Sequence, residues 1–479
     1  MTVMNDLKQT PLCIDLDGTL VLSDTLMESI VALLKKNFLY VFWLPIWLLS
    51  GRAYMKKQIA TRVKIRIDLL PYNKSFLEFL KSEYQRGRSL ILASGTDEII
   101  ANNIAQYLGL FQTVYASNGS TNFTGHRKKD KLVSLYGEKG FDYAGNASID
   151  LAIWKVCHQA IVVHSKPSFI QKIKNLVPVS QIFSEPPLKL HDILKTVRVH
   201  QWVKNILIFV PLITAHAWTM SSIGKSILAF LSFSLAASSI YIFNDFFDLE
   251  SDRQHHIKQY RSLASGVLSI PVGALIMSLL LFSSLWIASF LKLNFLGMLL
   301  IYIFINIAYS SYLKKKLLMD VILLASLYTI RILSGAVAIT VPVSSWLLAF
   351  SMFMFFSLAF IKRYSELYNL KQQDQTNSSG RSYVTDDLNH IGHLGATSGY
   401  ISVLVFALYI HSNNVSDLYY RPELLWLICP LLFYWISRIW LLTYRGHMNE
   451  DPVIFALHDK VSYLLGLLSA IFIFLAGPR

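Results

Sequence analysis

The sequence is poor in cysteine and has no sign of an export signal at its start. Its 479 residues include three cysteines, far apart and with no Cys-x-x-Cys pair. This argues against a disulfide framework and a structural zinc site, and it fits a reducing compartment. The first ten residues contain Asp6 and lack a long apolar core, so we expect no secretory signal peptide there.

Charged residues are also scarce, at 15% against roughly 25% in soluble domains, while 53% of the residues are hydrophobic. The apolar residues concentrate in 200–479, and residues 1–195 have the composition of a soluble domain. The net charge is +14. No zinc-finger spacing or other nucleic-acid motif accompanies it, so we expect no nucleic-acid partner and attribute the charge to cytoplasmic loops and phosphate-bearing ligands.

The second half predicts an all-α membrane bundle of about nine transmembrane helices. The segments are 202–219, 224–247, 270–290, 293–311, 318–340, 344–362, 397–412, 424–443 and 460–477. Loops rich in Lys and Arg, at 248–268, 312–317 and 362–396, alternate with loops that are poor in both. By the positive-inside rule, the basic loops and the N-terminal half lie on the cytoplasmic side of an inner (cytoplasmic) membrane.

Four polar residues follow one another at the end of the second apolar segment: Asn244, Asp245, Asp248 and Asp252. In a continuous helix the spacing of Asn244, Asp248 and Asp252 places them on one face. Carboxylates at membrane depth are costly and repel one another unless a cation lies between them. Hard oxygen ligands suit Mg²⁺, which typically bridges to phosphate groups. The pattern therefore predicts a membrane enzyme that handles a pyrophosphate.

This aspartate pattern resembles that of the UbiA superfamily of membrane prenyltransferases. Further segments narrow the resemblance to its decaprenyl-phosphate phosphoribosyltransferase branch, over roughly residues 190–479. These segments are Arg198–Asn205, Arg261–Gly266, Tyr309–Lys314, the stretch from Asp320 to Arg331, and Lys362–Leu367.

The resemblance implies that phosphoribosyl pyrophosphate donates 5-phosphoribose to a polyprenyl phosphate lipid. Mg²⁺ on Asp245, Asp248 and Asp252 would neutralise the leaving pyrophosphate, with Asp245 and Asp248 as catalytic residues. The predicted substrate-binding residues of this half are Arg198, Lys204, Asn244, Arg253, Lys258, Arg261, Lys314, Arg331 and Lys362.

An apolar strand ending in Asp15-Leu-Asp17-Gly-Thr19 resembles the first motif of the haloacid-dehalogenase (HAD) phosphatases. The resemblance implies that Asp15 is a nucleophile and Asp17 a general acid/base. Ser94 matches the phosphate-binding hydroxyl of the second motif. Lys128 is the first choice for the third-motif lysine, and Lys131 is the second.

The fourth motif departs from the family pattern, because Asn146 stands where an aspartate is usual. Asp150 follows it. Mg²⁺ ligands in this half would be Asp15, Asp17, Asn146 and Asp150. An amide oxygen can bind Mg²⁺ without contributing charge, so both an active and a weakened phosphatase stay open.

Predicted strands near 11–15, 88–93, 112–116, 141–144 and 159–163 alternate with helical stretches, which indicates a doubly wound α/β domain over residues 1–190. Residues 24–70 are predicted to form a helical cap. Its apolar stretch 38–49 fits either a membrane-facing segment or a buried cap core. A linker is predicted around 178–192, with Glu185-Pro186-Pro187 interrupting regular structure. Residues 191–479 would form the membrane domain.

Together the halves predict a Mg²⁺-dependent membrane transferase whose HAD-like domain dephosphorylates the lipid product or a related ester. One alternative is a prenyltransferase acting on an aromatic acceptor, but that family usually has a second aspartate-rich motif, and this sequence offers Asp320 alone. Another is a lipid-binding scaffold with a decayed phosphatase. The oligomeric state, including a homo-oligomer, is left open.

Overall fold

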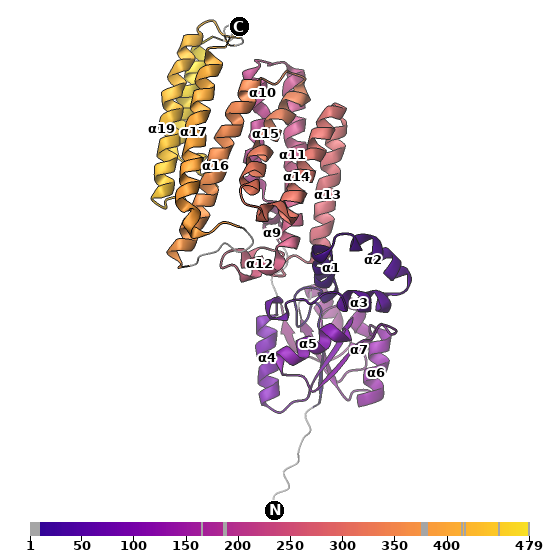
Figure 1. Ribbon diagram of the computed structural model, residues 1–479. Helices are drawn as coiled ribbons and strands as arrows, with labels where there is room; N and C mark the ends of the chain where they lie inside the picture. Colours follow the sequence, from indigo (N-terminus) through magenta and orange to yellow (C-terminus); the bar gives the residue numbers. More distant parts are fainter. Residues whose placement is uncertain are drawn as a thin grey trace, which may run out of the picture. The chain divides into compact units, whose positions relative to one another are not determined.

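The computed structural model describes residues 10–163, 166–184, 189–374, 382–412, 415, 418–448 and 451–477 (Figure 1). The chain divides into two compact units. The first comprises Met1–Val197 and Tyr241–Met277, and the second comprises Arg198–Ile240 and Ser278–Arg479. The aspartate pattern therefore belongs to the same unit as the N-terminal half.

The first unit is built on a six-stranded, fully parallel sheet of order β3-β2-β1-β4-β5-β6. Its strands are β1 (Leu12–Ile14), β2 (Leu90–Asp97), β3 (Thr113–Ser117), β4 (Asp142–Gly145), β5 (Ala160–Val163) and β6 (Val179–Phe183). This confirms the predicted doubly wound α/β fold. The linker prediction is wrong at β6, which lies inside 178–192; Glu185, Pro186 and Pro187 lie outside the described residues.

Both faces of the sheet are covered, because alternate strand residues point to opposite faces. Leu12 and Ile14 belong to a core that includes residues of α4 and α5, while Cys13 belongs to a core that includes residues of α6, α7 and α8. These helices are α4 (Lys74–Gln85), α5 (Glu98–Leu108), α6 (His126–Tyr136), α7 (Leu151–Trp154) and α8 (Pro167–Lys174), with the short 3₁₀ turns η1 (Ile67–Leu69) and η2 (Ser148–Asp150).

The segment between β1 and η1 folds into three helices, α1 (Thr25–Lys36), α2 (Tyr40–Leu49) and α3 (Arg52–Ala60). Figure 1 draws them as a group at one end of the sheet, with α2 at the outer edge. The carboxylate of Asp24 caps α1 by accepting from the N–H groups of Leu26 and Met27. The first unit also contains α9 (Leu190–Val197), α12 (Leu249–Gln254), η4 (Lys258–Tyr260), the end of α11 and the start of α13.

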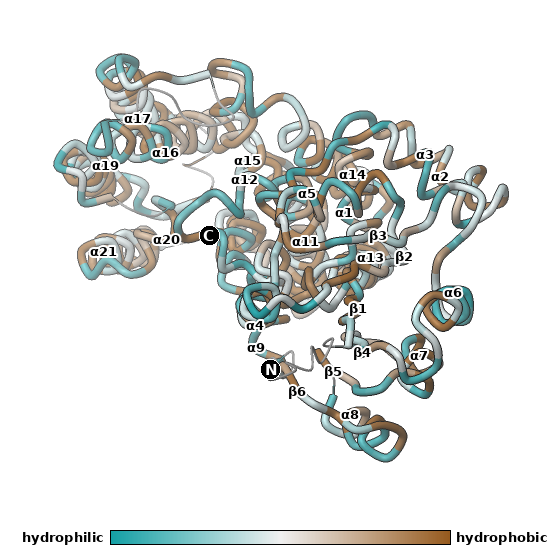
Figure 2. Tube along the Cα trace, turned by 90° about the horizontal axis from the view of Figure 1, so that it is seen from below, coloured by the Kyte–Doolittle hydropathy of each residue, from teal (hydrophilic) through white to brown (hydrophobic). Residues whose placement is uncertain are grey.

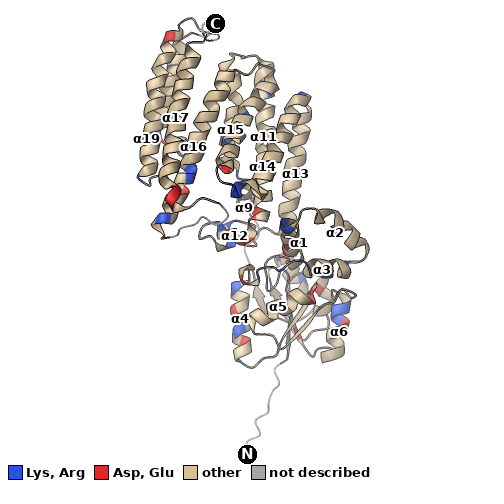
Figure 3. Cartoon of the chain, in the orientation of Figure 1, with Lys and Arg blue, Asp and Glu red and all other residues tan. Residues whose placement is uncertain are grey.

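Helices α11 and α13 each contribute residues to both units. The second unit consists of helices. They are η3 (Val199–Phe209), α10 (Val210–Thr214), α11 (Met220–Phe247), α13 (Ile270–Ser289), α14 (Leu293–Ser311), η5 (Leu313–Lys315), α15 (Met319–Ile339), α16 (Ser345–Gln372), η6 (Thr385–Asp387), α17 (Leu388–Ile410), η7 (Pro422–Leu427), α19 (Ile428–Tyr444), α20 (Pro452–Ala456) and α21 (Lys460–Leu475). Helices α16, α17 and α19 lie side by side in both ribbon and tube views (Figures 1 and 2). Charged residues of these long helices gather mainly toward their ends (Figure 3).

Seven of the described helical segments are long and apolar enough to cross a membrane, so the predicted nine spans are not confirmed. The first predicted span is an 11-residue 3₁₀ helix, η3, followed by the five-residue α10, which has Pro211 in its first turn. The ninth is the 16-residue α21, about 24 Å long, which is shorter than a hydrocarbon core of roughly 30 Å. Apolar length alone did not reveal these shorter helices.

Close backbone approach fixes how η3 packs on α15. A Cβ added at Gly335 would lie 2.0 Å from the carbonyl oxygen of Ile208, which a side chain cannot displace. By contrast, a Cβ at Gly297 of α14 would meet nothing within 4 Å. Small residues commonly permit such contacts between membrane helices.

We therefore expect Gly335→Ala to destabilise the detergent-solubilised protein by about 1–3 kcal/mol through overpacking. Gly297→Ala is the matched control and should melt like the wild type. Thermal unfolding followed by tryptophan fluorescence measures both. Equal melting of the two variants would show that the contact between η3 and α15 yields without strain.

Candidate functional site

The order of the sheet brings the predicted phosphatase residues together. Strand order reverses between β1 and β4, and ligands of open α/β sheets bind beyond the strand ends at such a point. Asp15 and Asp17 follow β1, Asn146 follows β4, and Ser94 lies in the neighbouring β2. The hydroxyl oxygen of Ser94 accepts from the N–H of Thr96 at 3.1 Å.

A buried chain of polar groups starts at Asp15. Lys128 Nζ donates to Asp15 Oδ1 at 2.7 Å and to the Tyr143 hydroxyl at 3.1 Å, and that hydroxyl donates to Asp150 Oδ1 at 2.9 Å. Burial lowers the pKa of Lys128, but the charges of Asp15 and Asp150 outweigh it and raise the pKa. The alternative Lys131 is exposed. Sequence reasoning missed Tyr143, which carries no motif signal.

Asp17 is held in a setting that suits a general acid. Its Oδ1 accepts from the N–H of Thr25 at 2.8 Å, and its Oδ2 accepts from the hydroxyl of Thr96 at 2.6 Å. Burial, with smaller contributions from the charges of Asp24 and Asp15, raises the pKa of Asp17 to about 7. A carboxyl group with such a pKa can hold and release a proton near neutral pH.

Asp150 shapes the turn that presents Asn146. Its Oδ2 accepts from the N–H groups of Asn146 and Ala147 at 3.2 and 3.1 Å. The Asn146 side chain lies against Gly18, where an added Cβ would meet Nδ2 at 2.1 Å. Asn146 thus lies beside the Asp15–Thr19 turn.

Mg²⁺ fits the oxygen donors at this turn, namely the carboxylates of Asp15 and Asp17 and the amide oxygen of Asn146. Burial, and to a smaller extent the charges of Asp24 and Asp15, raise the pKa of Asp17, and a cation bound here would oppose that rise. Among the described residues, no group of three or more His, Cys, Asp and Glu is arranged as a metal site. Asp150 is committed to the turn and to Tyr143, so in this geometry it positions Asn146.

Lys56 of α3 is a further cation that sequence reasoning missed. Its Nζ donates to the carbonyl oxygen of Gly95 at 2.5 Å and to Asn122 Oδ1 at 2.9 Å. Burial lowers the pKa of Lys56, while the charges of Asp17 and Asp24 act in the opposite direction. The cap therefore places a positive charge next to Ser94 and Thr96.

The aspartate pattern spans a break in the helix. Helix α11 ends at Phe247 and α12 begins at Leu249, so Asp248 lies between two helices and the pattern does not lie on one continuous helix. Helical spacing nevertheless persists, because the N–H of Asp248 donates to Asn244 O at 2.9 Å and the N–H of Asp252 donates to Asp248 O at 2.7 Å.

Arg261 bridges the two buried carboxylates of this pattern. Its Nη1 lies 3.1 Å from Asp245 Oδ1 and 2.6 Å from Asp252 Oδ2. Within the described residues, the buried side-chain oxygen of Asn244 has no hydrogen-bond partner. An unsatisfied buried oxygen beside two carboxylates fits a Mg²⁺ site, whose ligands would come from Asn244, Asp245, Asp248 and Asp252.

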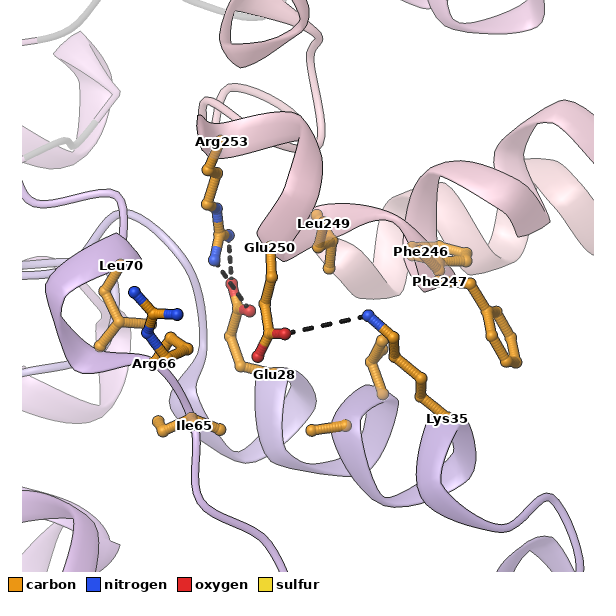
Figure 4. Close-up of a pocket in the computed structure, with 12 residues that line it drawn as sticks. Glu28, Lys35, Ile65, Arg66, Leu70, Phe246, Phe247, Leu249, Glu250 and Arg253 are labelled. Atoms are coloured by element: carbon orange, nitrogen blue, oxygen red, sulfur yellow. Dashed lines mark hydrogen bonds and ion pairs between the residues drawn. The ribbon is translucent and has the colours of Figure 1, made fainter. Parts of the chain in front are cut away.

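Arg253 is committed to the cap in this structure. Its guanidinium contacts both oxygens of Glu28 on α1, with the closer pair 2.5 Å apart, and its Nε donates to Ala264 O at 2.9 Å. Arg253 and Glu28 border a pocket between α1 and α12 (Figure 4). Lys258 lies exposed on η4.

In the second unit, Lys204 and Lys362 converge on Asp451, which sequence reasoning missed. Lys204 Nζ lies 2.6 Å and Lys362 Nζ 3.4 Å from Asp451 Oδ2. Burial raises the pKa of Asp451, but the two lysines together lower it to about 2. Two cations around one carboxylate leave a net positive charge, which suits a phosphate group.

Three further predicted cations also belong to this unit. Arg331 is buried, and its Nε donates to Asn205 Oδ1 at 2.8 Å and its Nη2 to the Tyr302 hydroxyl at 3.0 Å. Arg198 precedes η3 with a left-handed backbone, φ 55°. Lys314 is half-buried on η5.

Asp320 is fully engaged by protein groups. Arg363 Nε donates to one of its oxygens, and the Tyr383 hydroxyl donates to the other at 2.6 Å. Both Asp320 and Arg363 are almost completely buried. This carboxylate has the environment of a structural ion pair.

Comparison with known proteins identifies the class. The family model described as the UbiA prenyltransferase family matches residues 207–459. The uncharacterized protein y4nM of Sinorhizobium fredii is 34% identical over 97% of this chain and 90% of its own length. The chain belongs to the UbiA prenyltransferase family, and with its apolar helices it is a multi-pass membrane transferase.

More distant similarities extend over parts of the chain. Decaprenyl-phosphate phosphoribosyltransferase of Mycobacterium tuberculosis is 29% identical over 60% of this chain and 94% of its own length. A UbiA homolog from Archaeoglobus fulgidus, solved with GPP and Mg²⁺, has 18% identity and a TM-score of 0.45 over 60% of this chain and 98% of that one. A phosphoserine phosphatase structure has 18% identity and a TM-score of 0.26 over 39% and 98%.

The pKa of Asp17 leads to a stability prediction. Its folded value, about 7, lies above its ordinary value of 3.8, so ionisation of the buried carboxyl opposes folding increasingly from about pH 4 to pH 7. Without Mg²⁺, Asp17→Asn should stabilise the sheet strongly at pH 8 and less at pH 5. Hydrogen exchange of peptides from β1 and β2 measures this locally.

The control is Asp130→Asn on α6, whose side chain is 67% exposed and should have little effect at either pH. A stabilisation by Asp17→Asn that is equal at pH 5 and pH 8 would contradict the assigned titration.

Proposed function

We propose that residues 191–479 transfer 5-phosphoribose from phosphoribosyl pyrophosphate to a polyprenyl phosphate, and that residues 1–190 dephosphorylate the lipid product or a related ester. The phosphoribosyltransferase relatives support the choice of substrates, since the chain covers nearly their full length. The observation that carries the proposal is the aspartate pattern, with Arg261 between Asp245 and Asp252 and the unsatisfied oxygen of Asn244 beside them.

The proposed transfer separates charge at carbon 1 of the ribose. The bond from carbon 1 to the pyrophosphate oxygen breaks, and an oxygen of the lipid phosphate forms the new bond to that carbon. Mg²⁺ would neutralise charge on the leaving pyrophosphate. Asp245 and Asp248 would orient the donor, and Arg261 would add a positive charge at the same place.

The lysines of the second unit suit the other phosphate. Lys204 and Lys362 surround Asp451 with an excess of positive charge. We assign this group to the acceptor, whose phosphate would compete with Asp451 for the two ammonium groups. Arg331 would position Asn205 and Tyr302, to which it is hydrogen-bonded.

The alternative of prenyl transfer to an aromatic acceptor is less well supported by the side chains. That chemistry usually employs a second aspartate-rich motif, and here Asp320 is paired with Arg363 and accepts a hydrogen bond from Tyr383. A non-catalytic scaffold accounts poorly for the unsatisfied oxygen of Asn244.

In the phosphatase reaction we assign to the first domain, Asp15 attacks phosphorus and the ester oxygen leaves. Asp17 would donate the proton that this oxygen requires, and Lys128 would hold Asp15 in place. Water then hydrolyses the aspartyl phosphate. Mg²⁺ would reduce the repulsion between Asp15 and the phosphate.

We place the protein in the inner membrane with both sites on the cytoplasmic side. The alternation of basic and neutral loops supports this orientation. Phosphoribosyl pyrophosphate is a highly charged, soluble donor, so a site on that side would reach it directly.

Asp248→Asn should lower transfer of radiolabelled phosphoribose to polyprenyl phosphate by about 100-fold, because a ligand of the charge-neutralising cation is lost. The assay uses the purified full chain in detergent with Mg²⁺. Glu250→Gln, two residues away with a half-exposed side chain, is the control and should retain activity. No labelled lipid from folded wild-type protein would favour prenyl transfer instead.

Asp15→Asn should leave the transfer step intact and cause the phosphorylated lipid to accumulate. The wild type should convert that lipid to the dephosphorylated form with release of inorganic phosphate. Thin-layer separation of the labelled lipids distinguishes the two products. Identical product ratios for wild type and Asp15→Asn would assign the phosphatase a different substrate.

A further inference from the structure

Helix α2 has two apolar faces, and the cap buries one of them. Trp47 is 6% exposed and belongs to a small core with Leu33 and Ile59, and the guanidinium of Arg62 stacks 4.9 Å from its ring. Leu44 and Tyr40, respectively one and two turns before Trp47, pack against the same core. This face explains how α2 is attached to the rest of the cap.

The opposite face consists of large apolar side chains that contact little of the described protein. Leu39, Phe42, Trp43, Ile46 and Leu49 are 62%, 69%, 51%, 51% and 90% exposed. Their spacing of three, four, seven and ten residues from Leu39 places them along one stripe of the helix. This excludes a wholly buried cap core as the account of segment 38–49, since the core holds only the Trp47 side.

Basic residues flank this stripe on both sides. Lys35 and Lys36 end α1, and Arg52 begins α3; all three are exposed. From Leu39 to Leu49 there is no charged residue. An aromatic-rich apolar face between exposed cations is typical of a helix that lies in the interface of an anionic membrane.

Ion pairs within the first unit attach α1, the helix that precedes α2, to the segment that follows a membrane span. Lys35 Nζ lies 3.8 Å from Glu250 Oε2, and Glu28 binds Arg253, so α1 is attached to α12 at two places (Figure 4). Phe246 and Phe247, the last residues of α11, line the same pocket. Since α2 starts four residues after α1 ends, it belongs to the same compact unit as the end of the α11 span.

We propose that α2 is an interfacial membrane anchor of the cap. The stripe of Leu39, Phe42, Trp43, Ile46 and Leu49 inserts among the acyl chains of the bilayer that holds the spans, and Lys36 and Arg52 contact anionic headgroups. With ten residues, including Pro45, α2 is too short to span and lies parallel to the surface. This inference does not depend on which reaction the chain catalyses.

The test measures the depth of α2 in nanodiscs that contain the full chain. Phe42→Cys is labelled with an environment-sensitive fluorophore in a background with Cys429→Ser, because Cys13 and Cys157 are buried. Quenching by brominated lipid and by aqueous iodide is compared in discs of phosphatidylcholine with phosphatidylglycerol. Ser134→Cys, exposed on α6, is the matched control.

The anchor predicts that label at residue 42 is quenched several-fold more by brominated lipid than label at residue 134, and several-fold less by iodide. Adding Trp43→Glu and Ile46→Glu should reverse the order, and pure phosphatidylcholine should weaken lipid quenching. Strong iodide quenching at residue 42 would overturn the proposal. Protection of residue 42 from both quenchers would also overturn it and would indicate that a second copy of the chain covers α2. Equal quenching by brominated lipid in both lipid compositions would overturn the role of the cations.

Discussion

Removing a carboxylate from water is costly unless a cation or hydrogen-bond donors lie beside it, and this constraint organises the polar interior of both units. Several acidic side chains that are buried around Asp15, in the aspartate pattern and in the helical bundle contact Lys or Arg, whereas the buried Asp150 accepts from the Tyr143 hydroxyl and from backbone N–H groups. The pairs are Asp15 with Lys128, Asp245 and Asp252 with Arg261, Glu28 with Arg253, Asp320 with Arg363, and Asp451 with Lys204. The remaining polar atoms that lack a partner therefore stand out, and the oxygen of Asn244 is one of them.

One turn of helix α1 serves two sites in the first unit. The N–H of Thr25 donates to Asp17, while Glu28, one turn later, binds Arg253 next to Asp252. The same few residues therefore contribute to the surroundings of Asp17 and to the packing of the aspartate-bearing segment. Lys35, near the end of this helix, completes the attachment through Glu250. The cap is thus a structural link between two segments that are more than 200 residues apart in the chain.

Much of the fold could be predicted, because apolar runs followed by turn residues mark buried parallel strands. All five predicted strands exist. The edge strand β6 was missed because it carries exposed Ser180 and Gln181 and resembles a loop in composition. The first predicted span, 202–219, was wrong for a different reason. Hydropathy measures apolar length, and it does not distinguish the 3₁₀ backbone of η3 from an α-helix.

The sequence by itself determined the chemistry available to this protein: the Asp15–Thr19 turn, the aspartate pattern and the family resemblance follow from local spacing. Tertiary structure decided how each charge is used. Lys128 rather than Lys131 contacts Asp15, and Arg253 binds Glu28. In both pairs the partners lie more than 100 residues apart in the chain. Local spacing cannot specify a long-range ion pair, since which charges meet depends on how strands and helices pack. For the same reason, only the folded cap showed that α2 buries Trp47 and leaves Phe42 exposed.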